Sequence, residues 1–184
     1  LTLFLNDVAA GSINSNQTIC NGGDPVSFTS VVDGTGPGTI TYRWESRTGV
    51  NPFAPIAASN SPTYDEGNLA ITTDFRRVTI STYNTVVCEA ISNVITVFVN
   101  DVTSGSIGSD QTICSATAPA MLTDAVTATG SGIITYIWEF STDNEVSYAT
   151  VAGATLATFT PSALSVNTWY RRVATSTLNG NSCS

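Results

Sequence analysis

The side chains that usually perform acid–base or nucleophilic chemistry are sparse in this 184-residue chain, and histidine is missing altogether. Neither a Ser-His-Asp nor a Cys-His arrangement can therefore form. Among the aligned carboxylates, only Asp7 with Asp101 and Glu45 with Glu139 recur in both halves of the chain. No paired-carboxylate motif of the kind that cleaves glycosidic bonds accompanies them. We therefore expect no enzyme activity and no catalytic residue.

Two short clusters could provide oxygen ligands for Ca²⁺ between loops, Asp65-Glu66 and Asp143-Asn144-Glu145. Neither has the spacing of a defined calcium loop. We interpret both clusters as turn residues and expect no metal and no cofactor, with Ca²⁺ as the alternative.

The charge balance is acidic, with 14 Asp and Glu against six arginines, no lysine and a formal net charge of −8. Binding to nucleic acid or to an anionic membrane requires clustered cations, so neither is expected as a partner. No stretch approaches the roughly 20 apolar residues of a membrane span, so membrane insertion is not expected either.

Four cysteines, Cys20, Cys88, Cys114 and Cys183, permit three pairings. Joining Cys20 to Cys88 and Cys114 to Cys183 is the pairing that treats both halves of the chain alike. Closing each loop of about 69 residues would stabilise a domain by about 4 kcal/mol in the chain-entropy model. Such bonds predict an oxidising, extracellular location. The alternative is a set of reduced cysteines in a metal site, for which C-x-x-C spacing and histidine are lacking.

Trp44 and Trp138 each follow a tyrosine by two positions, at Tyr42 and Tyr136. Period-two alternation places such a pair on one face of a strand. We predict that all four residues belong to the cores of β-sandwiches, with a sugar-stacking platform as the alternative for the tryptophans.

Trp169 lacks this symmetry, because its counterpart in the first half is Asp74. We predict that Trp169 packs at an edge or against a neighbouring domain. Trp169 and Tyr148 are the candidate ligand contacts.

Two arginine pairs recur, Arg76-Arg77 and Arg171-Arg172. Adjacent strand residues face opposite sides, so neither pair can form one clamp around an anion. We predict structural ion pairs in which one arginine of each pair reaches Glu45 or Glu139 across neighbouring strands, with a ligand role as the alternative.

These recurrences come from an internal repeat. A shift of 94 positions makes 22 of the 42 residues in 6–47 identical to their counterparts, and after one inserted residue the shift becomes 95. The first shift aligns Gln17-Thr18-Ile19-Cys20 with Gln111-Thr112-Ile113-Cys114, and the second aligns Cys88 with Cys183. The chain therefore contains two copies of one domain.

We expect the copies to span residues 6–99 and 100–184, the second being truncated before its closing strand. Residues 1–5 match residues 95–99. They are expected to be the last strand of a preceding repeat in a longer array, or else the first strand of the first domain. Such a spare strand could pair within the chain or add to a neighbouring molecule.

The spacing of β-rich runs between turn clusters, about every 8 to 12 residues, is typical of a sandwich. No stretch shows helical periodicity. We predict an all-β fold of two tandem Ig-like β-sandwich domains, each with one disulfide. The predicted strands are 26–32, 39–46, 54–57, 72–81 and 94–99 in the first copy, and 133–139, 149–151, 157–159 and 168–175 in the second.

Four motifs together resemble a known repeat type: Gly-Ser-Ile-x-Ser-x-Gln-Thr-Ile-Cys, Ile-Thr-Tyr-x-Trp-Glu, aromatic-Arg-Arg-Val, and a later Cys followed by Ser92-Asn93-Val94-Ile95-Thr96-Val97. They resemble the Ig-like or PKD-like repeats of giant Bacteroidetes surface proteins, of which the SprB-type gliding-motility adhesins are members. The resemblance covers both copies. It implies a cell-surface filament exported by type IX secretion, moved by the gliding machinery, and able to contact polysaccharide such as agar.

The expected function is therefore a structural and adhesive bead in a large exported adhesin, in gliding motility and surface attachment. Its expected partners are neighbouring repeats of the same chain and a polysaccharide substratum. One alternative is a glycan-binding module that uses the variable loops 51–58 and 143–148. The other is a pair of spacer domains appended to a secreted hydrolase.

Overall fold

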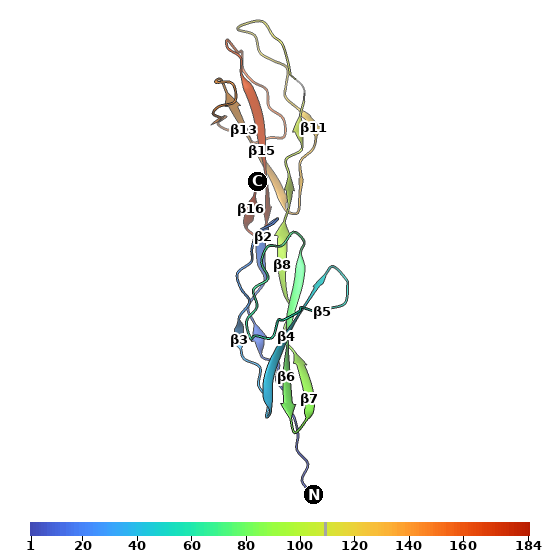
Figure 1. Cartoon of the computed structure of the whole chain (residues 1–184). Helices are drawn as coiled ribbons and strands as arrows, with labels where there is room; N and C mark the ends of the chain where they lie inside the picture. The colour runs from blue at the N-terminus through green and yellow to red at the C-terminus, as the bar shows by residue number, and fades with distance from the viewer. Residues whose placement is uncertain (109) are drawn as a thin grey trace. The chain divides into compact units, whose positions relative to one another are not determined.

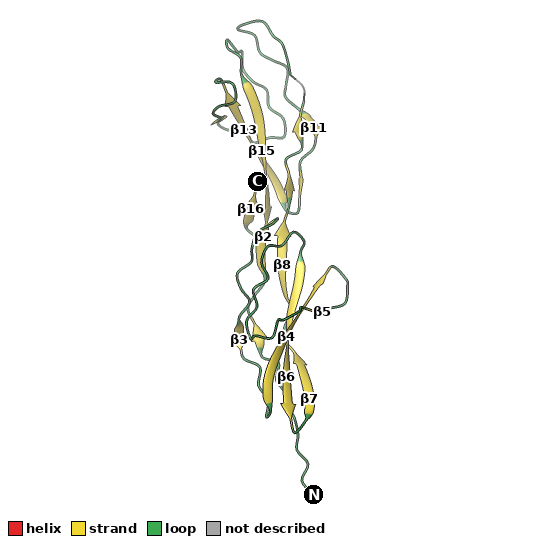
Figure 2. Ribbon diagram, viewed as in Figure 1, coloured by secondary structure: helices red, strands yellow, loops and turns green. Residues whose placement is uncertain are grey.

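The computed structural model describes residues 1–108 and 110–184, and the chain forms two compact units, Leu1–Val99 and Asn100–Ser184 (Figure 1). Every regular element of the described residues is a β-strand (Figure 2). The same residues include no helix with the length and hydropathy needed to span a membrane. The predicted all-β fold of two tandem Ig-like sandwiches is confirmed.

The first unit combines a large sheet with a small one. The large sheet has the order β2-β8-β6-β4-β5, and β7 also pairs with β6; the small sheet pairs β1 with β3. The strands are β1 (Ser12–Ile13), β2 (Gln17–Cys20), β3 (Ser30–Val32), β4 (Thr39–Thr48), β5 (Ala54–Pro55), β6 (Thr73–Tyr83), β7 (Val86–Ile91) and β8 (Ile95–Asn100).

The second unit repeats the central strands of this arrangement. Its main sheet has the order β14-β13-β15-β16, and two small sheets pair β10 with β11 and β9 with β12. The strands are β9 (Val102–Thr103), β10 (Ser106–Ile107), β11 (Asp124–Val126), β12 (Thr129–Gly130), β13 (Ile133–Ser141), β14 (Ala149–Thr150), β15 (Trp169–Leu178) and β16 (Asn181–Cys183).

Aromatic side chains from both layers fill the core of the first unit. Phe28, Trp44 and Phe75 are fully buried, and the ring centroids of Phe28 and Phe75 lie 4.8 Å apart. The ring of Tyr64 packs beside that of Trp44, with 5.7 Å between the ring centroids. The indole N–H of Trp44 donates to the carbonyl oxygen of Ser61 at 3.0 Å, so burying this ring leaves no polar atom unpaired.

The second core has the same design with different rings. Trp138 is fully buried, and its indole N–H donates to the carbonyl oxygen of Leu156 at 2.9 Å. Phe159 packs beside it at 5.6 Å, and the bridge between Leu122 and Phe159 stands where the first unit pairs Phe28 with Tyr64.

Two strand predictions were too long or wrong. The predicted strand 26–32 shortens to β3, and Phe28 instead makes an isolated bridge to Tyr64. The predicted strand 157–159 does not form, because Phe159 contributes one bridge to Leu122 and no continuous ladder. In both places an apolar run supplies single inward-facing rings to the core.

The predictions missed several strands, namely β1, β2, β9, β10, β11, β12, β16 and the longest of them, β7. Four of its six side chains are exposed and none is buried, so it lacks the apolar alternation of a half-buried strand. The turn that precedes it has two residues in the left-handed region, Asn84 (φ 46°) and Thr85 (φ 67°). Positive φ at both central positions is the geometry of a tight hairpin turn, here formed without glycine.

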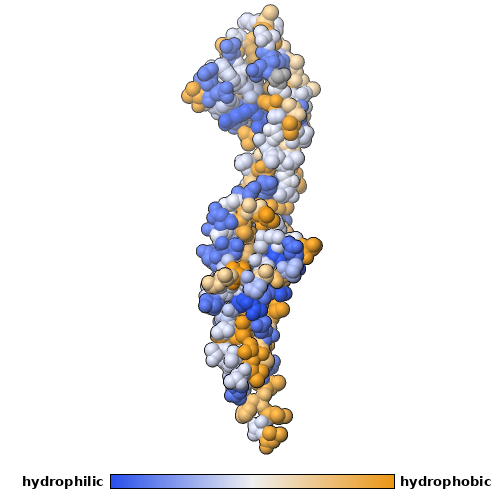
Figure 3. Space-filling model, turned by 45° about the vertical axis from the view of Figure 1, so that its right-hand side comes forward, coloured by the Kyte–Doolittle hydropathy of each residue, from blue (hydrophilic) through white to orange (hydrophobic). Residues whose placement is uncertain are grey.

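Residues 1–5 are exposed and belong to no strand, so they do not act as the first strand of the first unit. The rings of Phe4 and Tyr83 are nearly perpendicular, and their centroids lie 6.1 Å apart. Leu1, Leu3, Phe4 and Leu5 produce the apolar surface that Figure 3 shows near the N-terminus.

Replacing the buried indole of Trp44 with a methyl group should destabilise the first unit strongly. Trp44→Ala leaves a cavity inside the aromatic cluster, and we expect a loss of about 3–5 kcal/mol in the free energy of unfolding, measured by urea denaturation followed by far-UV circular dichroism. Val50→Ala changes a fully exposed side chain and should stay within about 0.5 kcal/mol of the parent. Equal midpoints for the two variants would contradict this account of the core.

Candidate functional site

The pairing of the two longest strands decides where the recurring arginines lie. In the first unit, β4 and β6 place Trp44 opposite Arg77 and Glu45 opposite Arg76. In the second unit, β13 and β15 place Trp138 opposite Arg172 and Glu139 opposite Arg171. Residues directly opposite each other in an antiparallel pair share a face. One arginine of each pair therefore points into the sandwich and the other points out.

Arg77 is the inward arginine of the first unit and is fully buried. One guanidinium nitrogen donates to the Ser30 hydroxyl and to the carbonyl oxygen of Pro62 at 3.0 Å. The other donates to the carbonyl oxygens of Ala10 and Val32, both at 3.3 Å. The guanidinium also stacks over the ring of Tyr42 at 4.8 Å. We call these acceptors and the tyrosine the arginine cage.

No described carboxylate forms an ion pair with Arg77. Burial lowers the pKa of Arg77 from its usual value, and its Nε atom is buried without a hydrogen-bond partner. A charged group in this position is stabilised by a serine hydroxyl, carbonyl dipoles and a ring face.

Arg172 occupies the equivalent cage in the second unit. It donates to the carbonyl oxygens of Ala157 at 2.7 Å and Ser104 at 3.4 Å, and stacks over the ring of Tyr136 at 4.5 Å. The difference is a carboxylate, because Asp124 takes the place of Ser30 and forms an ion pair with Arg172. In the second cage, a carboxylate therefore balances the charge of the arginine.

The outward arginines make ion pairs on the outer faces of the sheets; Glu45 of the first unit is buried, whereas the pair of the second unit is more exposed. Arg76 reaches Glu45 at 2.7 Å, and Arg171 reaches Glu139 at 2.7 Å. These are the cross-strand partners that the sequence suggested. An exposed pair such as that of Arg171 contributes about 0.2–1 kcal/mol.

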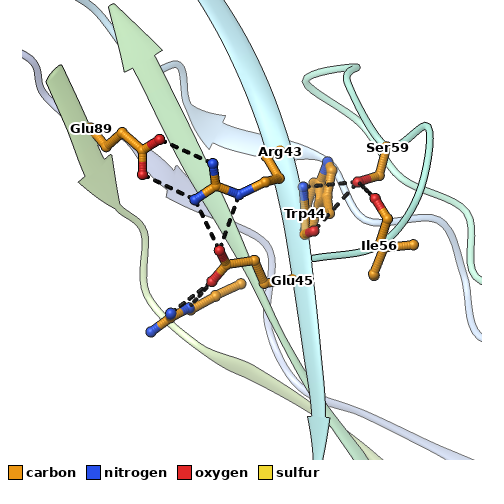
Figure 4. Close-up of polar contacts among 7 residues, drawn as sticks. Arg43, Trp44, Glu45, Ile56, Ser59 and Glu89 are labelled. Atoms are coloured by element: carbon orange, nitrogen blue, oxygen red, sulfur yellow. Dashed lines mark hydrogen bonds and ion pairs between the residues drawn. The ribbon is translucent and has the colours of Figure 1, made fainter. Parts of the chain in front are cut away.

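The first unit extends its outer pair into a network (Figure 4). Arg43 lies between Glu45 and Glu89 and contacts both carboxylate oxygens of Glu89 at 3.0 Å. The Glu89 carboxylate raises the pKa of Arg43, and the Arg43 guanidinium lowers the pKa of Glu89. The second unit has Ile137 where the first has Arg43. This surface network is thus not shared by the two copies.

Tyr148, a candidate ligand contact, is engaged within the second unit. Its ring lies 3.9 Å from the guanidinium of Arg171, and its hydroxyl donates to Glu145 at 3.1 Å. Phe53, its counterpart at the shift of 95, covers Arg76 at 4.1 Å in the same way. The sequence comparison could have revealed this pair, because an aromatic residue occupies both aligned positions.

Trp169, the other candidate, is half-buried at the start of β15 and pairs with Ser141. Its counterpart Asp74 makes an ion pair with Arg47 at 2.9 Å and accepts a hydrogen bond from Thr96 at 2.7 Å. The two copies therefore use this edge differently.

The acidic clusters are tied into turns. The Asp143 carboxylate accepts hydrogen bonds from the hydroxyl of Ser141 at 2.6 Å and from the hydroxyl of Ser147 at 2.5 Å. These bonds lower the pKa of Asp143 to about 2. In the other cluster, Asp65 accepts from Ser27, and Glu66 accepts from Tyr64. Among the described residues, no three acidic or cysteine side chains gather into a metal site.

The second unit carries an open depression of about 440 Å³. Its lining consists of apolar and threonine side chains with glycine, and it includes Met121, Leu156 and Phe159. Without a charged or amide side chain in the lining, this surface has few groups that could orient a polar ligand.

The predicted disulfides were wrong. Cys20 and Cys183 are disulfide-bonded, whereas Cys88 and Cys114 are free thiols. The predicted partners Cys20 and Cys88, and likewise Cys114 and Cys183, are therefore not joined.

Strand positions explain why Cys20 and Cys88 cannot pair. Cys88 lies on β7 opposite Ser81, near one end of β6. Cys20 ends β2, which lies beside β8, and β8 joins the other end of β6 at Thr73. Ser81 lies eight positions after Thr73 on β6, a distance of about 26 Å at roughly 3.3 Å per residue. The Cα atoms of a disulfide are at most about 7 Å apart.

Comparison with known proteins gives a family and a fold. The family model described as "Domain of unknown function (DUF8696)" matches the chain twice, over residues 9–101 and 103–184. The chain belongs to this family. No curated protein matches the DUF8696 chain.

A solved structure entitled "Three N-terminal domains of the bacteriophage RB49 Highly Immunogenic Outer Capsid protein (Hoc)" is similar in fold, with a TM-score of 0.55 and 10% sequence identity. The similarity covers 97% of the DUF8696 chain and 65% of the phage structure. At this identity the likeness shows the Ig-like tandem fold alone.

Removing the carboxylate of the second cage should destabilise the second unit. Asp124→Ala leaves Arg172 buried with one acceptor fewer, and we expect a loss of about 1.5–3 kcal/mol in the free energy of unfolding, as for hydrogen bonds to charged groups. Urea denaturation measures the loss. Asp110→Ala, which removes an exposed carboxylate, is the matched control. Unchanged stability in Asp124→Ala would show that the ion pair is dispensable.

Hydroxyl groups should control the titration of Asp143. In Ser141→Ala, the carboxylate loses the hydrogen bond that lowers its pKa most, so the pKa should rise from about 2 toward its usual value of 3.8. Since the folded-state pKa is depressed, this group stabilises the fold above its unfolded pKa, and the effect is lost as the pH falls toward 2. Carbon-13 NMR of the carboxyl group measures the shift. Thr168→Ala is the control, and an unmoved titration in Ser141→Ala would contradict the assignment.

Proposed function

We propose that the chain is a segment of a large exported cell-surface adhesin, in which repeats of this domain act as structural and adhesive beads of a filament. One observation carries the proposal: the features that both copies share lie inside each repeat or in its strand pairing. These features are the buried tryptophan, the arginine cage and the outer arginine–glutamate pair. Each of them stabilises a sandwich.

Other features of the outer surface differ between the copies. Ile137 replaces Arg43, and Trp169 replaces Asp74. A ligand site present in every repeat would need the same exposed groups in each copy, whereas a structural bead needs only the same interior. The difference therefore favours a structural role for the repeat as such.

The cellular setting comes from the sequence resemblance to SprB-type repeats of Bacteroidetes surface proteins. That resemblance suggests type IX secretion, attachment to surfaces and gliding motility. The presence of disulfide-bonded cysteines supports an oxidising location outside the cytoplasm.

Glycan binding is the second candidate, favoured by the half-buried Trp169 at the edge of the second sheet. An indole in such a place can stack on a sugar ring. The loop residue Tyr148 contributes less to this idea, because its ring already covers Arg171.

Antibodies against the purified chain should label intact cells of the producing organism without permeabilisation. We expect the signal to disappear after brief external protease treatment, because a surface filament is accessible to the enzyme. A cytoplasmic marker must stay unlabelled in the same cells. Labelling that requires lysis would refute the surface location.

Binding of the purified chain to agar beads separates the two candidates. If these two repeats contribute structure alone and the adhesive surface lies elsewhere in the filament, the chain should show no saturable binding, and Trp169→Ala should behave like the parent. Saturable binding that Trp169→Ala weakens about tenfold would establish the glycan-binding role, since loss of an aromatic stacking contact of about 1–1.5 kcal/mol has that effect.

A further inference from the structure

The four cysteines form two structural classes, and Cys20 and Cys114 make up the first. In the first unit, the carbonyl oxygen of Cys20 accepts a hydrogen bond from the amide of Gly23 at 2.8 Å; in the second unit, that of Cys114 accepts one from Thr117 at 3.2 Å. Isolated bridges tie both turns to a leucine, Gly23 to Leu69 and Thr117 to Leu164. Both cysteines are exposed. We call this end of the repeat the turn end.

Cys88 and Cys183 make up the second class. Each lies on the second strand of a hairpin and pairs with a serine of the long strand, Cys88 with Ser81 and Cys183 with Ser176. The hairpin turns are also alike, because Asn84 and Asn179 both have positive φ. Cys88 is half-buried and Cys183 is buried. We call this end of the repeat the hairpin end.

The two classes lie at opposite ends of one repeat. In the first unit they are separated by about 26 Å of β6, as measured from Thr73 to Ser81 at roughly 3.3 Å per residue. In the second unit, Leu164 marks the turn end and precedes β15, whereas Cys183 pairs with Ser176 near the other end of β15. A disulfide within one repeat is excluded in both units.

One member of each class is already oxidised. Cys20 of the turn class and Cys183 of the hairpin class are disulfide-bonded, while Cys114 and Cys88, which have the same local structures, are free. The two free thiols thus belong to complementary classes, and their structural equivalents show that both environments accommodate a disulfide.

We propose that Cys114 and Cys88 are complementary half-sites that form a disulfide between this chain and a second copy of the repeat, joining the turn end of one to the hairpin end of the other. The inference rests on the proposed function as a bead in a tandem array. Within an array, the tether between repeats raises the local concentration of each thiol near its partner. The filament would then contain disulfides between repeats and none within a repeat.

The reaction needs an oxidant, and a low-molecular-weight disulfide such as oxidised glutathione supplies it. The thiolate of Cys114 attacks this disulfide, forms a mixed disulfide and releases one glutathione thiol. The thiolate of Cys88 in the second molecule then attacks the sulfur of Cys114 and releases the second glutathione. Two protein thiols lose two electrons and two protons, and one glutathione disulfide becomes two glutathione thiols.

Mixing two variants that each keep one free thiol tests the complementarity. Cys88→Ser retains Cys114 as its free thiol, and Cys114→Ser retains Cys88. Under oxidised glutathione at high protein concentration, the mixture should form a disulfide-linked heterodimer at least about tenfold faster than either variant forms a homodimer, because only the mixture contains both classes. Isotope-labelling one variant distinguishes the dimers by mass, and peptide mapping should identify a bond between Cys114 and Cys88.

Circular dichroism and a thiol assay serve as controls, since both variants must remain folded and expose one thiol per chain. Homodimers that form as fast as heterodimers, an absence of cross-links, or loss of both thiols from monomeric parent protein would each overturn the proposal. If no cross-link forms but intact cells are labelled, the disulfide between repeats is rejected and the adhesin proposal stands. Efficient cross-linking without surface labelling would do the reverse.

Discussion

The antiparallel register between β4 and β6 determines both faces of the first sheet at once. It places Trp44 opposite Arg77 inside the sandwich and Glu45 opposite Arg76 outside it. A slip of β6 by one residue against β4 would turn the caged arginine toward water and bring Arg76 to the inner face, away from Glu45. β13 and β15 have the same register in the second unit. The core, the cage and the surface pairs therefore all depend on this one alignment.

Burying a charged arginine costs free energy of desolvation, yet the position of Arg77 explains how segments of the sandwich are linked to one another. The guanidinium of Arg77 satisfies carbonyl groups from segments far apart in sequence, near Ala10, Val32 and Pro62. Its planar fork of donors suits several acceptors at once. The exchange of Ser30 for Asp124 shows that the same cage can hold either a charged or a neutralised guanidinium.

The sequence indicated those parts of the design that side chains encode. Alternation placed Tyr42 and Trp44 on one face, and the opposite orientation of adjacent strand residues separated Arg76 from Arg77. The cage was not foreseeable, because most of its acceptors are backbone carbonyls, which every residue carries. The strand β7 gave no signal, because its side chains are mostly exposed. The aligned aromatics Phe53 and Tyr148 were a usable signal for the covered outer arginines.

The predicted cysteine pairing was wrong because it rested on symmetry between the two copies. Joining Cys20 to Cys88 and Cys114 to Cys183 treats two isolated copies alike, and for two closed domains no other pairing does so. In an array, however, linking the turn end of each repeat to the hairpin end of another also treats every copy alike. Only distance separates the two arrangements, and the length of β6 rules out the first. With one cysteine at each end, a repeat cannot form a disulfide that stabilises its own fold. It can form disulfides with other repeats, and these would resist forces that pull neighbouring repeats apart.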